Sequence, residues 1–390
     1  MVASGWNFQS WRQSYHNFRH RLAEYQTVTE KTVWALDPHT AAKHVILRKY
    51  LNAWLPKLTR FNGRVIICDG FAGPGVYSEG EEGSPIIALR AFLDHSYRDK
   101  MNAEIKYIFI ESDEKRCESL EQAIEDFKVP DSVGVTIIND EYEQAFGEIL
   151  DYLDEAESAL APTFAFIDPF GVSGVPLEII NRLMGHGGCE VFITFMVSYI
   201  HRFLSRPEFE PHCDRLFGCE DWRAAGELTG QERESFLRAL YQRQLEDKDS
   251  GVGAEYVRFF TMKDTKNKTI YDLFFATNHS SGIDAMKHAM WNVDQTGAYS
   301  FSDATDPDQE TLFSTEPDWD QLFAMLQSEF AGESVPWPTV EEAIRRTPFR
   351  ILKRPLQAES KKADTRFEIV NPEGTRLGTL DNATIIRFPG

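Results

Sequence analysis

The stretch VIICDGFAGPG, from Val65 to Gly75, is an apolar run that ends in an acidic residue and a glycine-rich turn. An apolar run of this length before such a turn is typical of a buried strand. Glycine has no Cβ and tolerates positive φ, so the turn lets the backbone approach a ligand closely. The segment therefore predicts the first strand of an α/β sheet, with a ligand pocket at its carboxyl end.

The turn does not follow the dinucleotide pattern G-x-G-x-x-G. Ser84 followed by Pro85 is a helix start signal, so we expect the next helix to begin about nine residues after the glycines. A pyrophosphate would need a helix N-terminus beside the turn. The spacing therefore favours a ligand that lacks phosphate.

Acidic residues also follow the next two apolar runs. Lys106–Ile110 precedes Glu111, and the run at 135–138 precedes Asp140. An acid at the end of a second strand is placed to accept hydrogen bonds from ribose hydroxyls, so we assign Glu111 that role. Asp113 could equally cap the helix that follows. Each acid taken alone could also be a solvated loop carboxylate.

A further apolar run, Phe164 to Ile167, ends in the motif Asp168-Pro169-Phe170-Gly171. Proline fixes φ and removes an N–H, so the strand cannot continue and the Asp168 carboxylate is held outward. The alternative is a simple turn that ends a strand. We expect this motif at the same sheet edge as the glycine turn, because parallel strands end together.

The segment D-x-F-A-G-x-G, Asp69 to Gly75, resembles motif I of class I S-adenosylmethionine-dependent methyltransferases. The resemblance implies a Rossmann-like α/β fold with a seven-stranded sheet and S-adenosyl-L-methionine as the cofactor. The cofactor-binding residues that it implies, with Asp140 against the adenine, are Asp69, Gly70, Phe71, Ala72, Gly73, Gly75, Glu111 and Asp140.

Asp168 to Gly171 stands where this family has motif IV, beside the transferred methyl group. Its form departs from the Asp-Pro-Pro-Tyr of adenine N6 enzymes and resembles the Asp-Pro-Phe-Gly of tRNA guanine N2-dimethyltransferases. The resemblance implies that Asp168, Pro169, Phe170 and Gly171 are the catalytic motif. Asp168 would hold an amine and Phe170 would stack on a base. Orientation supplies most of the gain, because the sulfonium is already an activated donor.

Other segments carry a second resemblance: WALDPHT with KH between 34 and 44, and FATNH with MK and MW between 275 and 291. With motifs I and IV, they resemble the three-Cys-motif partner proteins, from Trp34 to the C-terminus. Members of this bacterial family are encoded beside a three-cysteine protein that resembles iron–sulfur radical proteins. The resemblance implies that protein as a partner, and it opens a second hypothesis: a non-catalytic methyltransferase-like chain that binds nucleic acid or cofactor.

Composition and charge limit the cellular location and the kinds of partner that we expect. The 390 residues have 42% hydrophobic content and a formal net charge of −20. No apolar run reaches the 18 residues that span a bilayer and no signal pattern opens the chain, so we expect a cytoplasmic protein without membrane contact. The acidic charge argues against coating nucleic acid through the overall field. From Pro336 onward, however, ten Lys or Arg stand against seven Asp or Glu, as either a nucleic-acid contact or a solvated surface.

The chain divides into four predicted parts. Residues 1–33 form an aromatic arm, and 34–300 form the methyltransferase-like domain with a helical insertion at about 201–253. Residues 301–320 form an acidic linker, and 321–390 have the helix-then-hairpin order of a winged-helix-like module. Within the second part we expect a helix from Asp37-Pro38 to about Pro56, a fifth strand over 190–200 and a closing hairpin at 256–276.

Three residues keep open roles. Lys43 and His44 could flank the cofactor, or be a surface lysine and a satisfied histidine, and His279 could face the substrate or be an idle loop residue. The leading hypothesis is methylation of an amino group, of a nucleic-acid base, with the C-terminal module positioning the polymer. The base would have to be flipped or single-stranded. Methylation of a small metabolite stays open.

Overall fold

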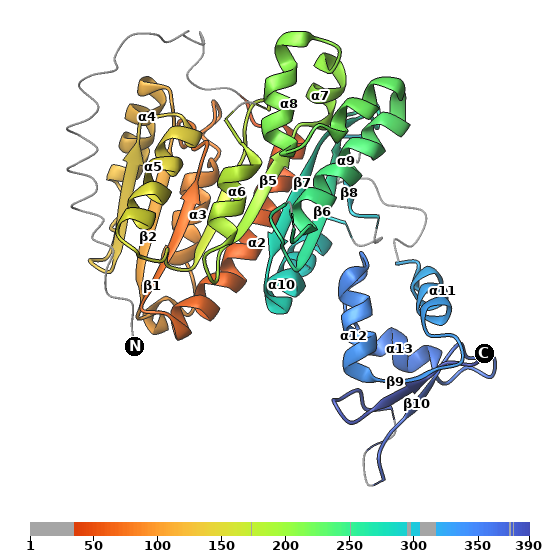
Figure 1. Cartoon of the computed structure of the whole chain (residues 1–390). Helices are drawn as coiled ribbons and strands as arrows, with labels where there is room; N and C mark the ends of the chain where they lie inside the picture. The colour runs from red at the N-terminus through yellow and green to blue at the C-terminus, as the bar shows by residue number, and fades with distance from the viewer. Residues whose placement is uncertain are drawn as a thin grey trace.

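The computed structural model describes residues 35–172, 174–249, 251–294, 298–304, 317–373, 376 and 378–390. These residues form a large α/β body and a smaller C-terminal unit beside one end of it (Figure 1). The aromatic arm predicted for 1–33 and most of the linker predicted for 301–320 lie outside the described residues. The four-part division of the chain therefore stays a prediction.

The body is built on one sheet with strand order β3-β2-β1-β4-β5-β7-β6-β8. The strands β1 to β5 run parallel, whereas β7 lies antiparallel between β5 and β6. This confirms the predicted class I methyltransferase-like sheet and its closing hairpin. A short eighth strand, β8, extends the expected seven by pairing with β6. The strands span Arg64–Asp69, Glu104–Ile110, Val133–Ile138, Thr163–Ile167, Glu190–Phe195, Tyr256–Lys263, Thr269–Thr277 and Ser300–Ser302.

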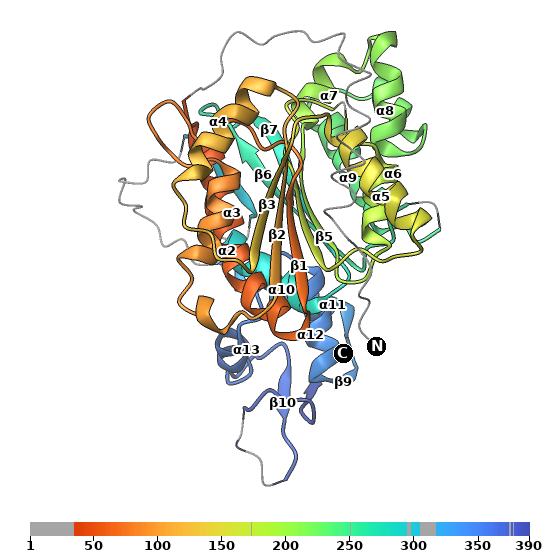
Figure 2. The ribbon, with the colours of Figure 1, turned by 90° about the vertical axis from the view of Figure 1, so that its left-hand side faces the viewer.

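Helices cover both faces of this sheet (Figure 2). One face packs against α2 (Pro38–Phe61), α3 (Ser84–Leu93), α4 (Glu114–Glu125) and α10 (Ser280–Trp291). The other packs against α5 (Tyr142–Glu155), α6 (Leu177–Met184) and the helical insertion. Because strands covered on both sides need apolar residues throughout, β1, β4 and β5 read as near-continuous hydrophobic runs. Within the described part of the chain, no helix combines the length and the apolar content needed to cross a membrane.

The helical insertion begins earlier than expected. The predicted strand over 190–200 is wrong beyond Phe195, because α7 (Val197–Phe203) starts two residues later. Periodicity alone cannot tell a short apolar strand from a buried helix, and this run continues apolar across the boundary. The insertion goes on through α8 (Glu210–Phe217) and α9 (Gly230–Glu246).

Helix α2 also departs from its prediction, since it continues through Pro56 to Phe61. Proline lacks the N–H that would bond the carbonyl of Asn52 one turn earlier. The His95 ring supplies that partner instead, with its Nε2 3.0 Å from the Asn52 oxygen. A residue 43 positions away therefore bonds the carbonyl that the proline leaves without its helical partner.

The C-terminal unit has its own apolar core and a three-stranded antiparallel sheet, β10-β11-β9. Its elements are α11 (Trp319–Glu329), β9 (Ser334–Pro336), α12 (Trp337–Arg346), α13 (Lys353–Glu359), β10 (Glu368–Val370) and β11 (Ile385–Arg387). The helix-then-hairpin order is as expected, and the name winged helix stays a prediction.

This unit docks at the edge of the sheet where the parallel strands begin (Figures 1 and 2). Lys287 donates to the carbonyls of Ile344 and Arg345 in the last turn of α12, at 2.9 and 3.2 Å, and Arg258 donates to the Arg345 carbonyl at 3.1 Å. Cations are favoured at a helix C-terminus, where carbonyls lack partners. These contacts therefore join the unit to the body.

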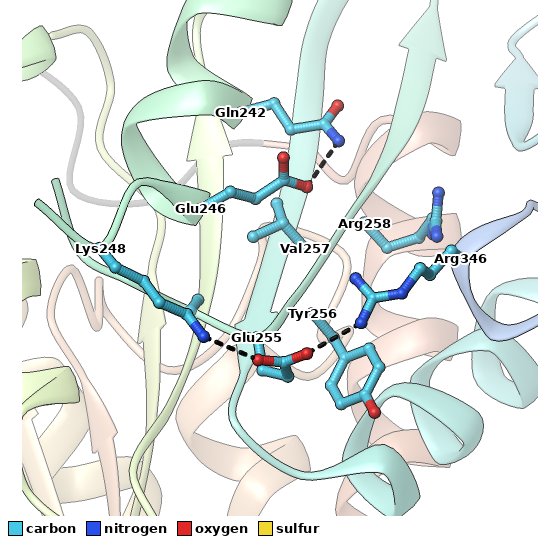
Figure 3. Close-up of a pocket in the computed structure, with 9 residues that line it drawn as sticks. Gln242, Glu246, Lys248, Glu255, Tyr256, Val257, Arg258 and Arg346 are labelled. Carbon is cyan, nitrogen blue, oxygen red and sulfur yellow. Dashed lines mark hydrogen bonds and ion pairs between the residues drawn. The ribbon is translucent and has the colours of Figure 1, made fainter. Parts of the chain in front are cut away.

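A pocket of about 340 Å³ lies at this junction, between α9, β6 and the end of α12 (Figure 3). Its cations are largely taken up, because Lys248 and Arg346 both reach Glu255, at 3.1 and 2.8 Å. Arg258 is occupied by its carbonyl contact on α12. This pocket is thus part of the junction and lies away from motifs I and IV.

Candidate cofactor and catalytic site

The glycine turn after β1 requires glycine at two of its positions. Gly75 has φ of 82°, and a Cβ there would lie 2.8 Å from the Leu120 side chain. A Cβ at Gly70 would lie 2.5 Å from the Tyr142 ring, far inside a van der Waals contact. The turn therefore packs closely against α4 and α5 and presents its backbone at the strand edge, as the sequence predicts.

Asp69 ends β1 and is buried, with one carboxylate oxygen left without a partner among the described residues. The Phe71 N–H donates to Oδ1 at 3.1 Å, whereas Oδ2 accepts nothing. Burial raises the pKa of Asp69 to about 7, although the nearby Ser84 hydroxyl and the Phe71 N–H oppose the rise. A buried, unpaired acceptor is costly, so a ligand that donates a hydrogen bond or carries positive charge suits this position.

Glu111 ties the end of β2 to the glycine turn. Its carboxylate accepts from the N–H groups of Gly73 and Asp113, both at 2.9 Å, and the side chain is buried. Each carboxylate oxygen has a second lone pair, so these bonds leave room for a hydroxyl donor. The role of Glu111 as a ribose ligand stays a prediction. Asp113 caps α4 by accepting from the Arg116 N–H at 3.0 Å, which was the alternative left open for it.

Asp140 lies at the same edge, two residues after β3, and is half-buried. Its Oδ1 accepts from the Glu141 N–H at 2.8 Å. The neighbouring Asn139 donates to the carbonyls of Glu111 and Ser112, at 3.0 and 2.9 Å. Asn139 thus holds the ends of β2 and β3 together, and the assignment of Asp140 to the adenine stays a prediction.

Motif IV lies beside motif I, because β4 pairs directly with β1. Asp168 follows β4, and its carboxylate is held from two sides. Lys43 of α2 donates to Oδ2 and Thr194 of β5 donates to Oδ1, both at 2.5 Å. The Lys43 side chain is 5% exposed and that of Asp168 is 25% exposed. Because Lys43 and Thr194 donate to different carboxylate oxygens, the plane of the carboxylate is fixed. Each oxygen keeps a second lone pair that can accept from a ligand.

Two titratable neighbours of this pair, His44 and Tyr271, are neutral. His44 of α2 is buried beside Tyr77, and burial together with Lys43 lowers its pKa to about 3. The Tyr271 ring lies 5.2 Å from the Lys43 ammonium, and burial with Asp168 raises the pKa of its hydroxyl well above the usual value. Lys43 and Asp168 are therefore a charged pair inside an aromatic wall.

Within the rest of motif IV, Pro169 is buried and Phe170 faces solvent. Phe170 is 69% exposed, and Gly171 lies beside the Tyr199 ring of α7. His279 is elsewhere, since it precedes α10 at the edge where β7 ends and β5 begins. Of the two roles left open for His279, a place facing the substrate does not fit, because the antiparallel direction of β7 returns the chain to the opposite edge.

No protein-family model matches the chain, and no curated protein matches its sequence. Among solved structures, it is similar to Trm1 from Pyrococcus horikoshii in complex with S-adenosyl-L-methionine, at 12% identity over 93% of each chain and a TM-score of 0.35. A putative methyltransferase, yhhF, from Escherichia coli matches 39% of this chain and 69% of its own at 18% identity and a TM-score of 0.26. The fold assignment here rests on the strand order described above.

An O-methyltransferase from Bacillus cereus in complex with SAH is also similar, at 11% identity and a TM-score of 0.31. The match covers 70% of this chain and 91% of that one. These comparisons show similarity to other proteins, whereas the site geometry described above comes from the residues of this chain.

Sequence reasoning missed Thr194 and Tyr271 and left Lys43 open. Thr194 is the one hydroxyl residue in the apolar strand β5, which is the signal that could have marked it. Lys43 carried no such signal, because its meeting with Asp168 depends on how α2 lies across the sheet.

Proposed function

We propose that the protein is an S-adenosylmethionine-dependent methyltransferase that acts on an amino group of a nucleic-acid base. The observation that carries the proposal is the Asp168 carboxylate, clamped by Lys43 and Thr194 on the strand next to the glycine turn. A fixed acceptor beside a cofactor turn is what amine methylation requires, because orientation of the lone pair supplies most of the rate.

The residues of motif I fit the proposed cofactor. The unpaired Oδ2 of Asp69 suits a positively charged amino group, and Glu111 keeps the turn in place through Gly73. Gly75 lets the backbone come close, since its conformation and space exclude a side chain. When bound, S-adenosylmethionine supplies an activated methyl group. Asp140 is the residue we assign to the adenine.

The residues of motif IV would hold the acceptor. Asp168 would accept a hydrogen bond from the exocyclic amine, which turns the nitrogen lone pair toward the methyl group. The proton that the methylated nitrogen sheds passes to the Asp168 carboxylate or to water. Lys43 and Thr194 would keep Asp168 from rotating, and the exposed Phe170 ring offers a face for the base.

The proposed winged-helix module would contact the polymer far from the target base. It lies at the edge where the parallel strands begin, whereas Asp168 lies where they end. Helix α2 runs between the two edges, and its 24 residues span about 36 Å. A polymer bound at both places would therefore have to be long or folded back.

The same placement favours a second candidate, a methyltransferase-like partner of a three-cysteine-motif protein. A protein docked on the C-terminal unit would not touch Asp168, so its binding would not require methyl transfer. This candidate predicts binding of the partner or of nucleic acid without methyl transfer.

The first experiment is calorimetric titration of the purified chain with S-adenosylmethionine and S-adenosylhomocysteine. We expect binding by the unaltered protein and weaker binding by Asp69→Asn, which keeps the shape of the side chain. Glu329→Gln, an exposed residue of the C-terminal unit, is the matched control for the change in charge. Absence of binding by the folded unaltered chain would exclude a methyltransferase that acts alone.

Methyl transfer is then measured with labelled cofactor on single-stranded RNA and DNA. Activity should disappear in Asp168→Ala, which removes the acceptor, while S-adenosylhomocysteine still binds. Cofactor binding without transfer to any nucleic acid would favour the partner candidate.

A further inference from the structure

Helix α7 and the turn after it carry an aromatic and basic face. The Tyr199 and Phe203 rings have centroids 4.5 Å apart, and both are half-buried. The Arg206 guanidinium lies 4.7 Å from the centre of the Phe203 ring, and that of Arg202 lies 5.9 Å from it. Two arginines therefore stack around one aromatic side chain at the surface.

This face borders motif IV. Helix α7 follows β5 directly, and β5 carries the Thr194 that bonds Asp168. A Cβ on Gly171 would lie 3.9 Å from the Tyr199 ring, an ordinary van der Waals contact. The exposed Phe170 is the neighbour of Gly171, so the aromatic residue of the motif lies one residue away from the contact with α7.

The charge of this face is opposite to that of the chain. No Asp or Glu occurs between Val191 and Pro207, although the chain as a whole has a net charge of −20. Arg202 and Arg206 are exposed, and neither forms an ion pair with a residue that the structure describes. Glu208 and Glu210 lie just beyond, and Glu210 is bonded to Arg223. The patch therefore offers two uncompensated positive charges next to the site.

We propose that the face formed by Tyr199, Arg202, Phe203 and Arg206 binds the single-stranded nucleotides that flank the target base. This inference rests on the proposed function. Grooves for single strands combine backbone-tracking cations with aromatic and guanidinium planes on which unpaired bases stack. A duplex offers phosphates but keeps its bases stacked on each other, so the single strand is the form that fits.

The alternative is that these rings only pack the insertion. Tyr199, Phe203 and Phe209 lie against the core on this side of the sheet, with the Phe203 and Phe209 centroids 6.1 Å apart. Packing alone explains the aromatic rings, but it does not explain why the surface arginines lack carboxylate partners. A test on the arginines, which leaves the packing intact, separates the two.

The test is fluorescence anisotropy of labelled oligouridylate and oligothymidylate of about 12 nucleotides, within the range that single-strand modules cover. The test variant is Arg202→Gln with Arg206→Gln. The matched control is Lys57→Gln with Arg60→Gln at the far end of α2, where Arg60 lies 5.4 Å from the ring of the 74% exposed Phe61. Both variants remove two charges, and the control also removes an arginine from an aromatic ring.

We expect the test variant to bind at least about tenfold more weakly at low salt. The slope of log affinity against log salt should fall by about 1.4, since each lost phosphate contact contributes about 0.7 for single strands. The control should bind as the unaltered protein does, and a duplex of equal length should bind more weakly than the single strands. Oligouridylate and oligothymidylate together show whether the face prefers RNA or DNA.

Equal affinity of the test variant and the unaltered chain, equal losses in both variants, or absence of single-strand binding would overturn the inference. Calorimetry with S-adenosylhomocysteine on the same samples keeps the two proposals apart. Intact cofactor binding without oligonucleotide binding would contradict only the proposed nucleotide-binding face. Arginine-dependent oligonucleotide binding without cofactor binding or methyl transfer would contradict the proposed function and still support the nucleotide-binding face.

Discussion

The two ends of the sheet each hold a buried lysine, and the two lysines have different partners. At the end with motifs I and IV, Lys43 bonds the Asp168 carboxylate. At the other end, Lys287 bonds the backbone carbonyls of Ile344 and Arg345, and burial together with Arg258 lowers its pKa well below the usual value. The first fixes a side chain that a substrate can reach, and the second caps a helix. The partner of a buried cation therefore indicates whether it serves the site or the architecture.

The largest expected effect is on the Lys43 side. Lys43→Met should lower methyl transfer by about 100-fold, because Asp168 loses the contact that sets its orientation. Stability should change little, since Asp168 is partly exposed and can regain water. Initial rates and urea unfolding measure the two quantities. Lys49→Met, on the exposed face of the same helix, is the control. A variant that keeps its rate would remove Lys43 from the site.

The Lys287 side should give the opposite pattern. Lys287→Met leaves the carbonyls of Ile344 and Arg345 without this donor, which costs about 1–3 kcal/mol of stability. Methyl transfer by the folded protein should not change. Urea unfolding measures the loss, and Lys361→Met on the exposed surface of the C-terminal unit is the control. A stable variant with reduced transfer would contradict the comparison.

The next effect concerns the pH dependence of Asp69. Its pKa of about 7 in the folded protein is above that of an unfolded aspartate, so its contribution to stability is full below about pH 4 and is lost as pH rises to 7. Ionised Asp69 is the better partner for a cationic ligand. Affinity for S-adenosylhomocysteine should therefore rise by up to about fivefold between pH 6 and 7, as the ionised fraction of Asp69 rises. Calorimetry should show this rise, and Asp69→Asn should show a flat profile at weaker affinity.

The smallest expected effect concerns an ion pair at the junction between the body and the C-terminal unit. Arg345 bonds Asp284 at 3.1 Å, but Asp284 is exposed enough for water to screen the pair. Asp284→Asn should therefore cost less than about 1 kcal/mol, because such pairs contribute little. The same urea experiment compares it with Lys287→Met. A larger loss in Asp284→Asn would mean that surface ion pairs hold the C-terminal unit.

Local pattern was enough for part of the site. The run from Val65 to Gly75 and the proline after Asp168 predict two strand ends and their turns, because apolar runs, glycine and proline act on neighbouring residues. Pattern failed where distant residues decide. The predicted strand end near Ile200 and helix end near Pro56 were wrong, and the carbonyl left by Pro56 is bonded by His95.

The sequence by itself determined that Asp69 and Asp168 each end an apolar strand and that a glycine turn follows Asp69, since each strand, acid and turn are contiguous in the chain. Only the tertiary structure decided that Lys43 and Thr194 clamp Asp168, across 125 and 26 residues. It also decided that His279 and the C-terminal unit lie at the opposite edge. The physical reason is that strand order and strand direction bring residues together at a sheet edge, and neither is written in any local stretch of the chain.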